Sequence, residues 1–110
     1  MIVIKLGGSV LSDRLHPSTF PDLRQTMKNE KIVIVHGGGK DVTDIATKLG
    51  KEQRFIVSPQ GVRSRYTDKE TIEIYTMVMS GKINKMIVGM LIRCGIKAIG
   101  ISGIDGVTIK

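Results

Sequence analysis

The segment that most constrains the fold is residues 31–40, which read Lys-Ile-Val-Ile-Val-His-Gly-Gly-Gly-Lys. The β-branched residues 32–35 predict a strand that is buried on both faces, as in a covered parallel sheet. Gly37, Gly38 and Gly39 then interrupt the chain, and apolar residues at helical spacing predict a helix that ends at Gly50. This arrangement favours anion binding, because glycines allow close backbone approach and the helix N-terminus offers free N–H groups.

The start of the chain has the same arrangement. Residues 2–4 predict a second short buried strand, which Lys5 follows just before the turn at Gly7 and Gly8. A lysine at the carboxyl end of a parallel strand lies at the crevice where open α/β sheets bind ligands. One alternative is that the glycines only turn the chain. The two turns together with Lys5 favour a site that handles phosphate groups.

Length and composition describe one small globular domain. The chain has 110 residues, of which 41% are hydrophobic and 25% are charged, and both fractions are ordinary for a soluble protein. A single cysteine, Cys94, excludes an internal disulfide framework and suits a reducing compartment. No apolar stretch reaches the length of a membrane span. We therefore expect a cytoplasmic protein without a membrane partner.

The net charge of +7 has several explanations. Nucleic-acid binders usually cluster their basic residues and interleave them with aromatic ones, whereas here the basic residues are spread and aromatics are scarce. We therefore expect no nucleic-acid partner. Anionic substrates explain the charge as well, and so does an acidic part that lies outside this chain. No set of side chains has metal-ligand spacing, so no metal-ligating residue is predicted.

The remaining elements alternate between strands and helices. The patterns predict a helix over residues 19–29, a hairpin with strands at 54–57 and 62–66, and a buried strand at 98–101, with extended structure starting at 107–109. Thr67 and Glu70 form a capping box for a long amphipathic helix through residue 94, whose inner face includes Ile72 and Tyr75 and which breaks near Gly81. This alternation predicts an α/β fold with a mainly parallel sheet.

Two common phosphate-binding motifs are excluded. Asp41 stands where a Walker A loop needs Ser or Thr, and Val42 stands where a Rossmann fingerprint needs its third glycine. Residues 5–9 and 36–40 instead resemble the two N-terminal signatures of the amino acid kinase family. Residues 61–63, 67–71, 82–85 and 98–106 resemble its acetylglutamate kinase branch. Residues 58–67 are similar to archaeal enzymes that phosphorylate glutamate or aminoadipate held on a small acidic carrier protein.

This resemblance implies a three-layer α/β/α fold with a projecting β-hairpin. It also implies phosphorylation of the side-chain carboxylate of an N-blocked glutamate or aminoadipate by ATP with Mg²⁺, in arginine or lysine biosynthesis. Lys5 would be catalytic and would neutralise the transferred phosphoryl group. The residues that would bind phosphate are Gly7, Gly8, Gly37, Gly38 and Gly39. The residues that would bind the substrate are Gly38, Gly39, Arg63 and Arg65. Arg63 would hold the α-carboxylate, while Arg65 suits a protein-sized blocking group or is simply a solvated hairpin charge.

The resemblance covers only the N-terminal portion of a family member. The family's nucleotide-binding lobe and second catalytic lysine correspond to positions beyond Lys110. Residues 1–110 therefore match the N-terminal, acyl-acceptor-binding portion, which we expect to be inactive alone and to belong to a homodimer or a higher homo-oligomer. A non-catalytic anion-binding or regulatory fragment of the same fold is the alternative. Whether the acceptor is acetylated or carrier-linked, and whether it is glutamate or aminoadipate, stays open.

Overall fold

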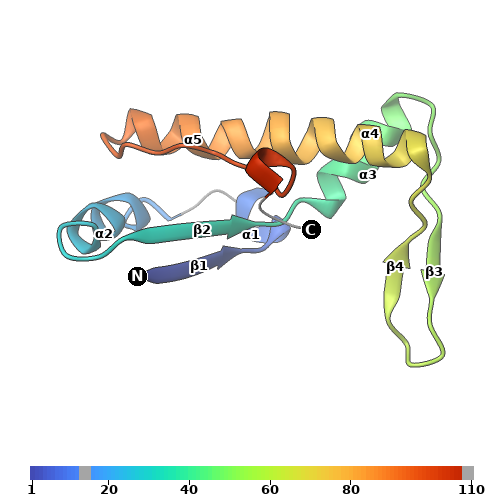
Figure 1. Ribbon diagram of the computed structural model, residues 1–110, viewed down its shortest axis with the longest axis horizontal. Helices are drawn as coiled ribbons and strands as arrows, with labels where there is room; N and C mark the ends of the chain where they lie inside the picture. The colour runs from blue at the N-terminus through green and yellow to red at the C-terminus, as the bar shows by residue number, and fades with distance from the viewer. Residues whose placement is uncertain (13–15, 108–110) are drawn as a thin grey trace.

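The computed structural model describes residues 1–12 and 16–107. In chain order its elements are β1 (Ile2–Leu6), α1 (Gly8–Ser12), α2 (Thr19–Thr26), β2 (Ile32–His36), α3 (Gly39–Lys48), β3 (Phe55–Val57), β4 (Arg63–Arg65), α4 (Lys69–Thr76), the π-helix η1 (Met77–Ile83), α5 (Asn84–Arg93) and the 3-10 helix η2 (Asp105–Val107). Figure 1 shows β1 and β2 side by side below the continuous helix α4–η1–α5, and a hairpin of β3 and β4 that projects from its far end.

The sheet at the centre of the described chain is parallel. Ile2 pairs with Ile32 at one end of β1 and β2, and Leu6 pairs with His36 at the other. Ile4, Leu6 and Ile34 lie against α2 and α5, where they line a small apolar cavity with side chains of both helices. This mixture of helices and a parallel sheet confirms the predicted α/β class. No helix in the described ranges is long and apolar enough to cross a membrane.

The other face of this sheet is open. Val3 and Val33 are exposed, and Val35 is 49% exposed. The prediction that these strands are buried on both faces is therefore wrong for the described chain. The physical reason is that the described helices cover one face only, so that alternate residues along each strand point away from them.

The long helix keeps one buried stripe across its π-helical turn. The buried apolar residues along it are Ile74, Val78, Ile83, Ile87 and Leu91. Three of the four steps between these residues are four residues long, but the step from Val78 to Ile83 is five, which leaves the face of an α-helix. The wider turn of η1, with its i→i+5 hydrogen bonding, returns Ile83 to the stripe. The predicted break near Gly81 is therefore wrong, since the chain stays helical there.

Two finer predictions about this helix also need correction. Ile72 and Tyr75, which we expected on the inner face, are exposed, and Ile74 takes the inner position. The N-cap is Asp68 and not Thr67, because the Asp68 carboxylate accepts a hydrogen bond of 2.8 Å from the Thr71 amide. The helix begins near the expected residue, but its register differs from the predicted one.

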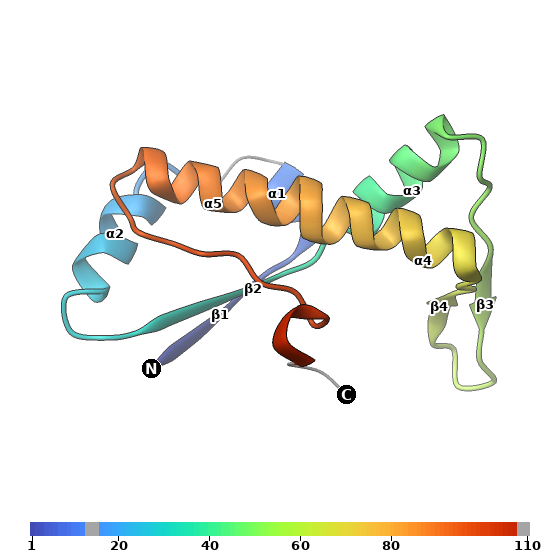
Figure 2. The same cartoon turned by 45° about the horizontal axis from the view of Figure 1, so that its top comes forward.

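The predicted strand at residues 98–101 does not form. This segment runs back from the end of α5 (Figures 1 and 2) without ladder pairing among the described residues, and Ile99 is 89% exposed. Side chains of α5 bind its carbonyl groups instead: Lys85 Nζ donates to Gly100 at 3.0 Å, and Asn84 Nδ2 donates to Ile101 at 3.3 Å. Of the extended structure expected at 107–109, Val107 ends η2 and the other two residues lie outside the described ranges.

An ion-pair cluster joins the end of α3 to the start of α4. Lys51 Nζ lies 2.8 Å from Asp68 Oδ2 and 2.7 Å from Glu70 Oε2. The backbone amide of Lys51 donates to the Ala46 carbonyl at 2.8 Å, which fixes the cluster to α3. The hydrogen bond from Lys51, followed by that from the Thr71 amide, holds the pKa of Asp68 well below its usual range.

This cluster generates a prediction about pH. Asp68→Asn keeps an oxygen for the Thr71 amide but removes the charge that Lys51 binds, so we expect a lower melting temperature near neutral pH. Because folding lowers the pKa of Asp68 from its ordinary value of 3.8, its stabilisation is present above that pH and is lost as the pH falls. Urea unfolding at a series of pH values should show that the difference in free energy of unfolding between wild type and variant shrinks as the pH falls. Asp44→Asn, at an exposed position of α3, is the matched control and should show no such difference. A difference that is constant down to about pH 2.5 would contradict the assignment.

Candidate functional site

The two glycine turns meet at the carboxyl ends of β1 and β2. The Gly37 amide donates a hydrogen bond of 2.9 Å to the Leu6 carbonyl. A methyl group placed on Gly37 would lie 3.4 Å from the Gly8 nitrogen, and one on Gly8 would lie 3.5 Å from Gly38 Cα. The two turns are therefore close neighbours, with space for no more than a methyl group at these two positions. The structure brings Gly7 and Gly8 together with Gly37, Gly38 and Gly39, which the sequence placed at one rim.

The π-helix packs directly onto this contact. A Cβ atom on Gly38 would lie 2.1 Å from Ile83 Cδ1 and 3.1 Å from Met79 Sδ. Ile83 is 1% exposed, so it has no room to withdraw. Gly38 is therefore required on steric grounds, which sequence patterns alone could not establish, because Ile83 is distant along the chain.

The geometry of the turns suits an anion. Helix α3 starts at Gly39, and its N-cap, Gly38, has no side chain that could bind the amides of the first turn. Such amides and the helix dipole attract negative charge. The carboxylate in this first turn, Asp41, is paired with Lys82 Nζ at 2.7 Å, which reduces its repulsion of an anion.

Lys5 lies beside the first turn, on the open face of the sheet. It pairs with Val35 in the parallel ladder and is exposed. Because residues alternate along a strand, its side chain points to the same face as Val3, away from the helices. In the described chain no acidic side chain forms an ion pair with it. The ammonium group is thus close in sequence to Gly7 and Gly8 and is not committed to a partner in the fold.

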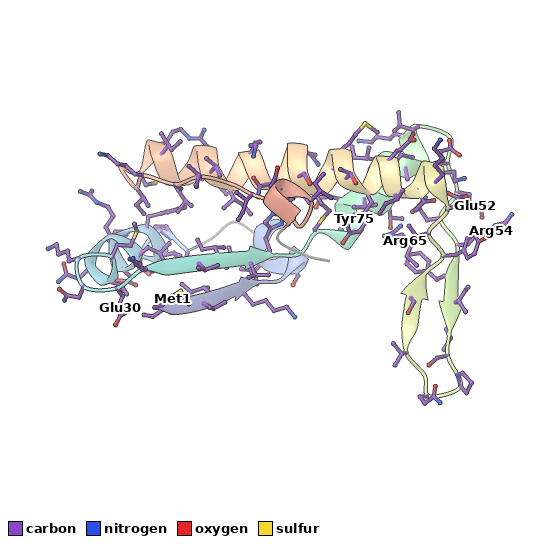
Figure 3. All side chains as sticks on the ribbon, viewed as in Figure 1. Met1, Glu30, Glu52, Arg54, Arg65 and Tyr75 are labelled. Carbon is purple, nitrogen blue, oxygen red and sulfur yellow. The ribbon has the colours of Figure 1, made fainter. Side chains whose placement is uncertain are left out.

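Arg65 is bound to the second turn. Its Nη2 donates to the Gly39 carbonyl at 2.8 Å and to Thr43 Oγ1 at 3.0 Å, and its Nη1 donates to Gln53 Oε1. Figure 3 shows Arg65 on the inner side of the hairpin, toward the helices, and Arg54 on the outer side. These bonds use three of the five N–H groups of a guanidinium, so Arg65 is not a solvated surface charge.

Arg63 is held less tightly than Arg65. Its Cζ lies 4.0 Å from the centroid of the Phe55 ring, and the Arg65 Cζ lies 4.9 Å from the same centroid. The Arg63 side chain is exposed. Arg63 therefore stands on the same side of the hairpin as Arg65, as their spacing of two residues predicts for a strand, with its guanidinium edge available to a ligand.

A polar cluster behind the second turn was missed by the sequence analysis. Asn84 is buried, lies 3.5 Å from His36 Nε2 and accepts a hydrogen bond of 3.0 Å from Lys85 Nζ. His36 Nδ1 lies 3.1 Å from the Gly37 carbonyl. Since a carbonyl can only accept, Nδ1 carries the proton and Nε2 is free to accept from Asn84. The available signal was weak: an asparagine directly after an apolar position of a long helix.

A cavity of about 620 Å³ lies beside β2, next to this cluster. Its walls include His36, Tyr75, Met79, Asn84 and Ser102. In the described ranges no three histidine, cysteine or acidic side chains come close enough together to hold a metal ion.

Comparison with known proteins places the chain in a family. The amino acid kinase family matches residues 1–110, so the chain belongs to the amino acid kinase family. A relative from Saccharolobus solfataricus named LysW-aminoadipate/LysW-glutamate kinase is 48% identical over 106 residues, which are 96% of this chain and 39% of the relative. A relative from Nitrosopumilus maritimus, which carries the same name marked "putative", is 58% identical over 110 residues, which are 100% of this chain and 41% of the relative. The chain thus spans about two fifths of the length of these relatives.

The packing at Gly38 generates a prediction. Gly38→Ala should destabilise the fold by about 1–3 kcal/mol, the usual cost of overpacking a filled core. Ile83→Val removes the Cδ1 atom that the new methyl group would meet, so the double variant should be more stable than the sum of the two single changes implies. Urea unfolding of the four proteins measures this coupling.

Gly81→Ala is the matched control for this experiment. Gly81 lies in η1, and a Cβ there would meet nothing within 4 Å, so we expect little change or a small gain in stability. Additive effects of Gly38→Ala and Ile83→Val would show that the contact is not the cause of the destabilisation.

Proposed function

We propose that the chain is the acyl-acceptor-binding portion of an ATP-dependent kinase that phosphorylates the side-chain carboxylate of an N-blocked glutamate or aminoadipate. The observation that carries this proposal is the meeting of the two glycine turns at the carboxyl ends of β1 and β2, in a chain of the amino acid kinase family. The names of the relatives support the same class of reaction and a role in lysine or arginine biosynthesis.

The chemistry of such a reaction agrees with the residues present. A carboxylate with a pKa near roughly 4.3 is already ionised at neutral pH, so the reaction needs no general base. The obstacle is electrostatic, because one anion attacks another. Lys5 would neutralise the phosphoryl oxygens, and the amides at Gly8 and Gly38 would hold them, with Gly7, Gly37 and Gly39 shaping the turns. Positioning and charge neutralisation of this kind supply most of the catalysis in phosphoryl transfer.

ATP and Mg²⁺ fit this arrangement. The backbone amides of the second turn lie at the start of α3, where the helix N-terminus suits phosphate oxygens. Since the described side chains do not gather into a metal-ligating group, we propose that Mg²⁺ is held chiefly by the nucleotide phosphates, whose charge it screens.

The acceptor would be bound at the hairpin and the second turn. Arg63 would hold the α-carboxylate, because its planar guanidinium can donate two parallel hydrogen bonds. Gly38 and Gly39 would complete this side of the site, with Arg65 bound to the Gly39 carbonyl beside them. We propose a carrier-linked acceptor, because the relatives are named for LysW-linked substrates and the net charge of +7 would attract an acidic carrier. Free acetylglutamate is the competing acceptor.

The open surfaces suggest how the chain is completed. We propose that the exposed face of β1 and β2 is covered by further chain in the whole protein, which would give three layers. Exposed apolar side chains along the long helix would form a contact between subunits of a homo-oligomer; they are Ile72, Met77, Met86 and Ile92. A biosynthetic kinase of this kind would act in the cytoplasm.

The role of Lys5 can be tested in the full-length protein. Lys5→Ala should lower kcat by about 10²–10³, the loss typical of one preorganised electrostatic group. Lys31→Ala is the matched control, since Lys31 is an exposed lysine at the opposite end of the same sheet, and it should leave kcat unchanged. A folded Lys5→Ala protein that turns over within a few-fold of wild type would remove Lys5 from the catalytic assignment.

The nature of the acceptor can be tested by measuring kcat/KM at different ionic strengths. For a carrier-linked acceptor, kcat/KM should fall as ionic strength rises from about 0.02 to 0.3 M, because attraction between the basic surface and an acidic carrier is screened. With acetylglutamate the same change should have little effect on kcat/KM. Equal activity with both acceptors, without salt sensitivity for the carrier, would favour an ordinary acetylglutamate kinase.

A further inference from the structure

We propose that Arg65 and Phe55 are positioning residues that hold Arg63 at a fixed place relative to the glycine turns. This inference rests on the proposed function of Arg63 as the ligand of the acceptor's α-carboxylate. It adds a mechanical link between the hairpin, which would bind the acceptor, and the turn, which would bind the phosphoryl group.

The first step of the link is the attachment of Arg65 to α3. The Gly39 carbonyl accepts from Nη2 at 2.8 Å, Thr43 Oγ1 accepts from the same atom at 3.0 Å, and Gln53 Oε1 accepts from Nη1. Thr43 Oγ1 in turn donates to the Gly39 carbonyl at 3.1 Å. Three acceptors around one planar group fix its orientation, as a single ammonium could not.

The second step passes through the Phe55 ring. Phe55 pairs with Arg65 across the hairpin, so their side chains share a face. The Cζ atoms of Arg65 and Arg63 lie 4.9 Å and 4.0 Å from the ring centroid, within cation–π range. Among the described residues no hydrogen-bond or ion-pair partner holds the Arg63 guanidinium, so the Phe55 ring is what locates it.

The third step is that the hairpin has few other connections. Figures 1 and 2 show it projecting from the ends of α3 and α4, away from β1 and β2. In the described chain, the hydrogen bonds between the hairpin strands and α3 all come from Arg65. Without them the position of Arg63 would depend on a two-stranded ribbon attached at its base, and such ribbons are only marginally rigid.

Geometry matters here because the acceptor must meet the phosphoryl group in line. A misplacement of about 1 Å can cost roughly a hundredfold in rate. Arg63 binds the acceptor, whereas Arg65 holds Arg63 in position. The competing possibility is that Arg65 itself contacts the acceptor with its two remaining N–H groups. The two possibilities predict different results when both arginines are removed.

The test is a double-mutant cycle in the full-length protein. Arg63→Ala should raise the KM for the acceptor roughly tenfold or more, the size of one lost charged hydrogen bond. Arg65→Ala should raise the same KM by several-fold, and the double variant should be no worse than Arg63→Ala alone, because a positioning residue has no effect once its target is gone. The KM for ATP should stay unchanged in all three. Arg54→Ala removes an exposed arginine next to Phe55 and is the matched control with wild-type kinetics.

Two further variants keep both arginines and remove what holds Arg65. Thr43→Val combined with Gln53→Leu deletes two of the three hydrogen-bond acceptors of the Arg65 guanidinium. Phe55→Leu deletes the ring that both guanidinium groups contact. Each should raise the acceptor KM in the same direction as Arg65→Ala, and neither should add to the effect of Arg63→Ala. These variants carry the test if Arg65→Ala does not fold.

The outcomes separate this inference from the proposed function. A wild-type protein that phosphorylates no N-blocked glutamate or aminoadipate overturns both. An active wild type in which the losses of Arg63→Ala and Arg65→Ala multiply overturns only the positioning role and shows that Arg65 contacts the acceptor directly. A wild-type KM for the acyl acceptor in the Thr43→Val/Gln53→Leu variant and in the Phe55→Leu variant likewise overturns the positioning role of Arg65.

Discussion

The backbone contact between Gly8 and the turn at Gly37 and Gly38 determines where the other elements lie. It joins the ends of β1 and β2, and the helices α1 and α3 both begin there. Ile83 fixes the long helix on top of the contact, and Arg65 holds the hairpin to its edge. A side chain at Gly38 would collide with Ile83, so a substitution there would displace the long helix relative to the turn.

Much of this arrangement could be predicted because its signals are local. Glycines after a run of β-branched residues specify a strand that ends in a turn, and the pattern at residues 54–66 specifies a hairpin. The strand expected at 98–101 failed because a strand needs a partner as well as propensity. Lys85 and Asn84 bind the carbonyls of Gly100 and Ile101, and neither the residues nor their spacing shows this.

The long helix shows a different limit of sequence reading. The sequence predicts a break near Gly81, where Val78 and Ile83 are five residues apart. A π-turn satisfies the same spacing without ending the helix. The same turn directs Ile83 against Gly38 and Asn84 toward His36. The link from Arg65 through Phe55 to Arg63 could not be predicted, since it depends on the distance between the hairpin and α3.

The two-stranded sheet leaves backbone donors and acceptors along the outer sides of β1 and β2 without ladder partners among the described residues. Strands rich in isoleucine and valine with such edges are templates onto which other chains can add. Residues 1–110 in isolation would therefore be prone to self-association through these edges. Pairing of either edge with another strand would satisfy these groups and suppress that association.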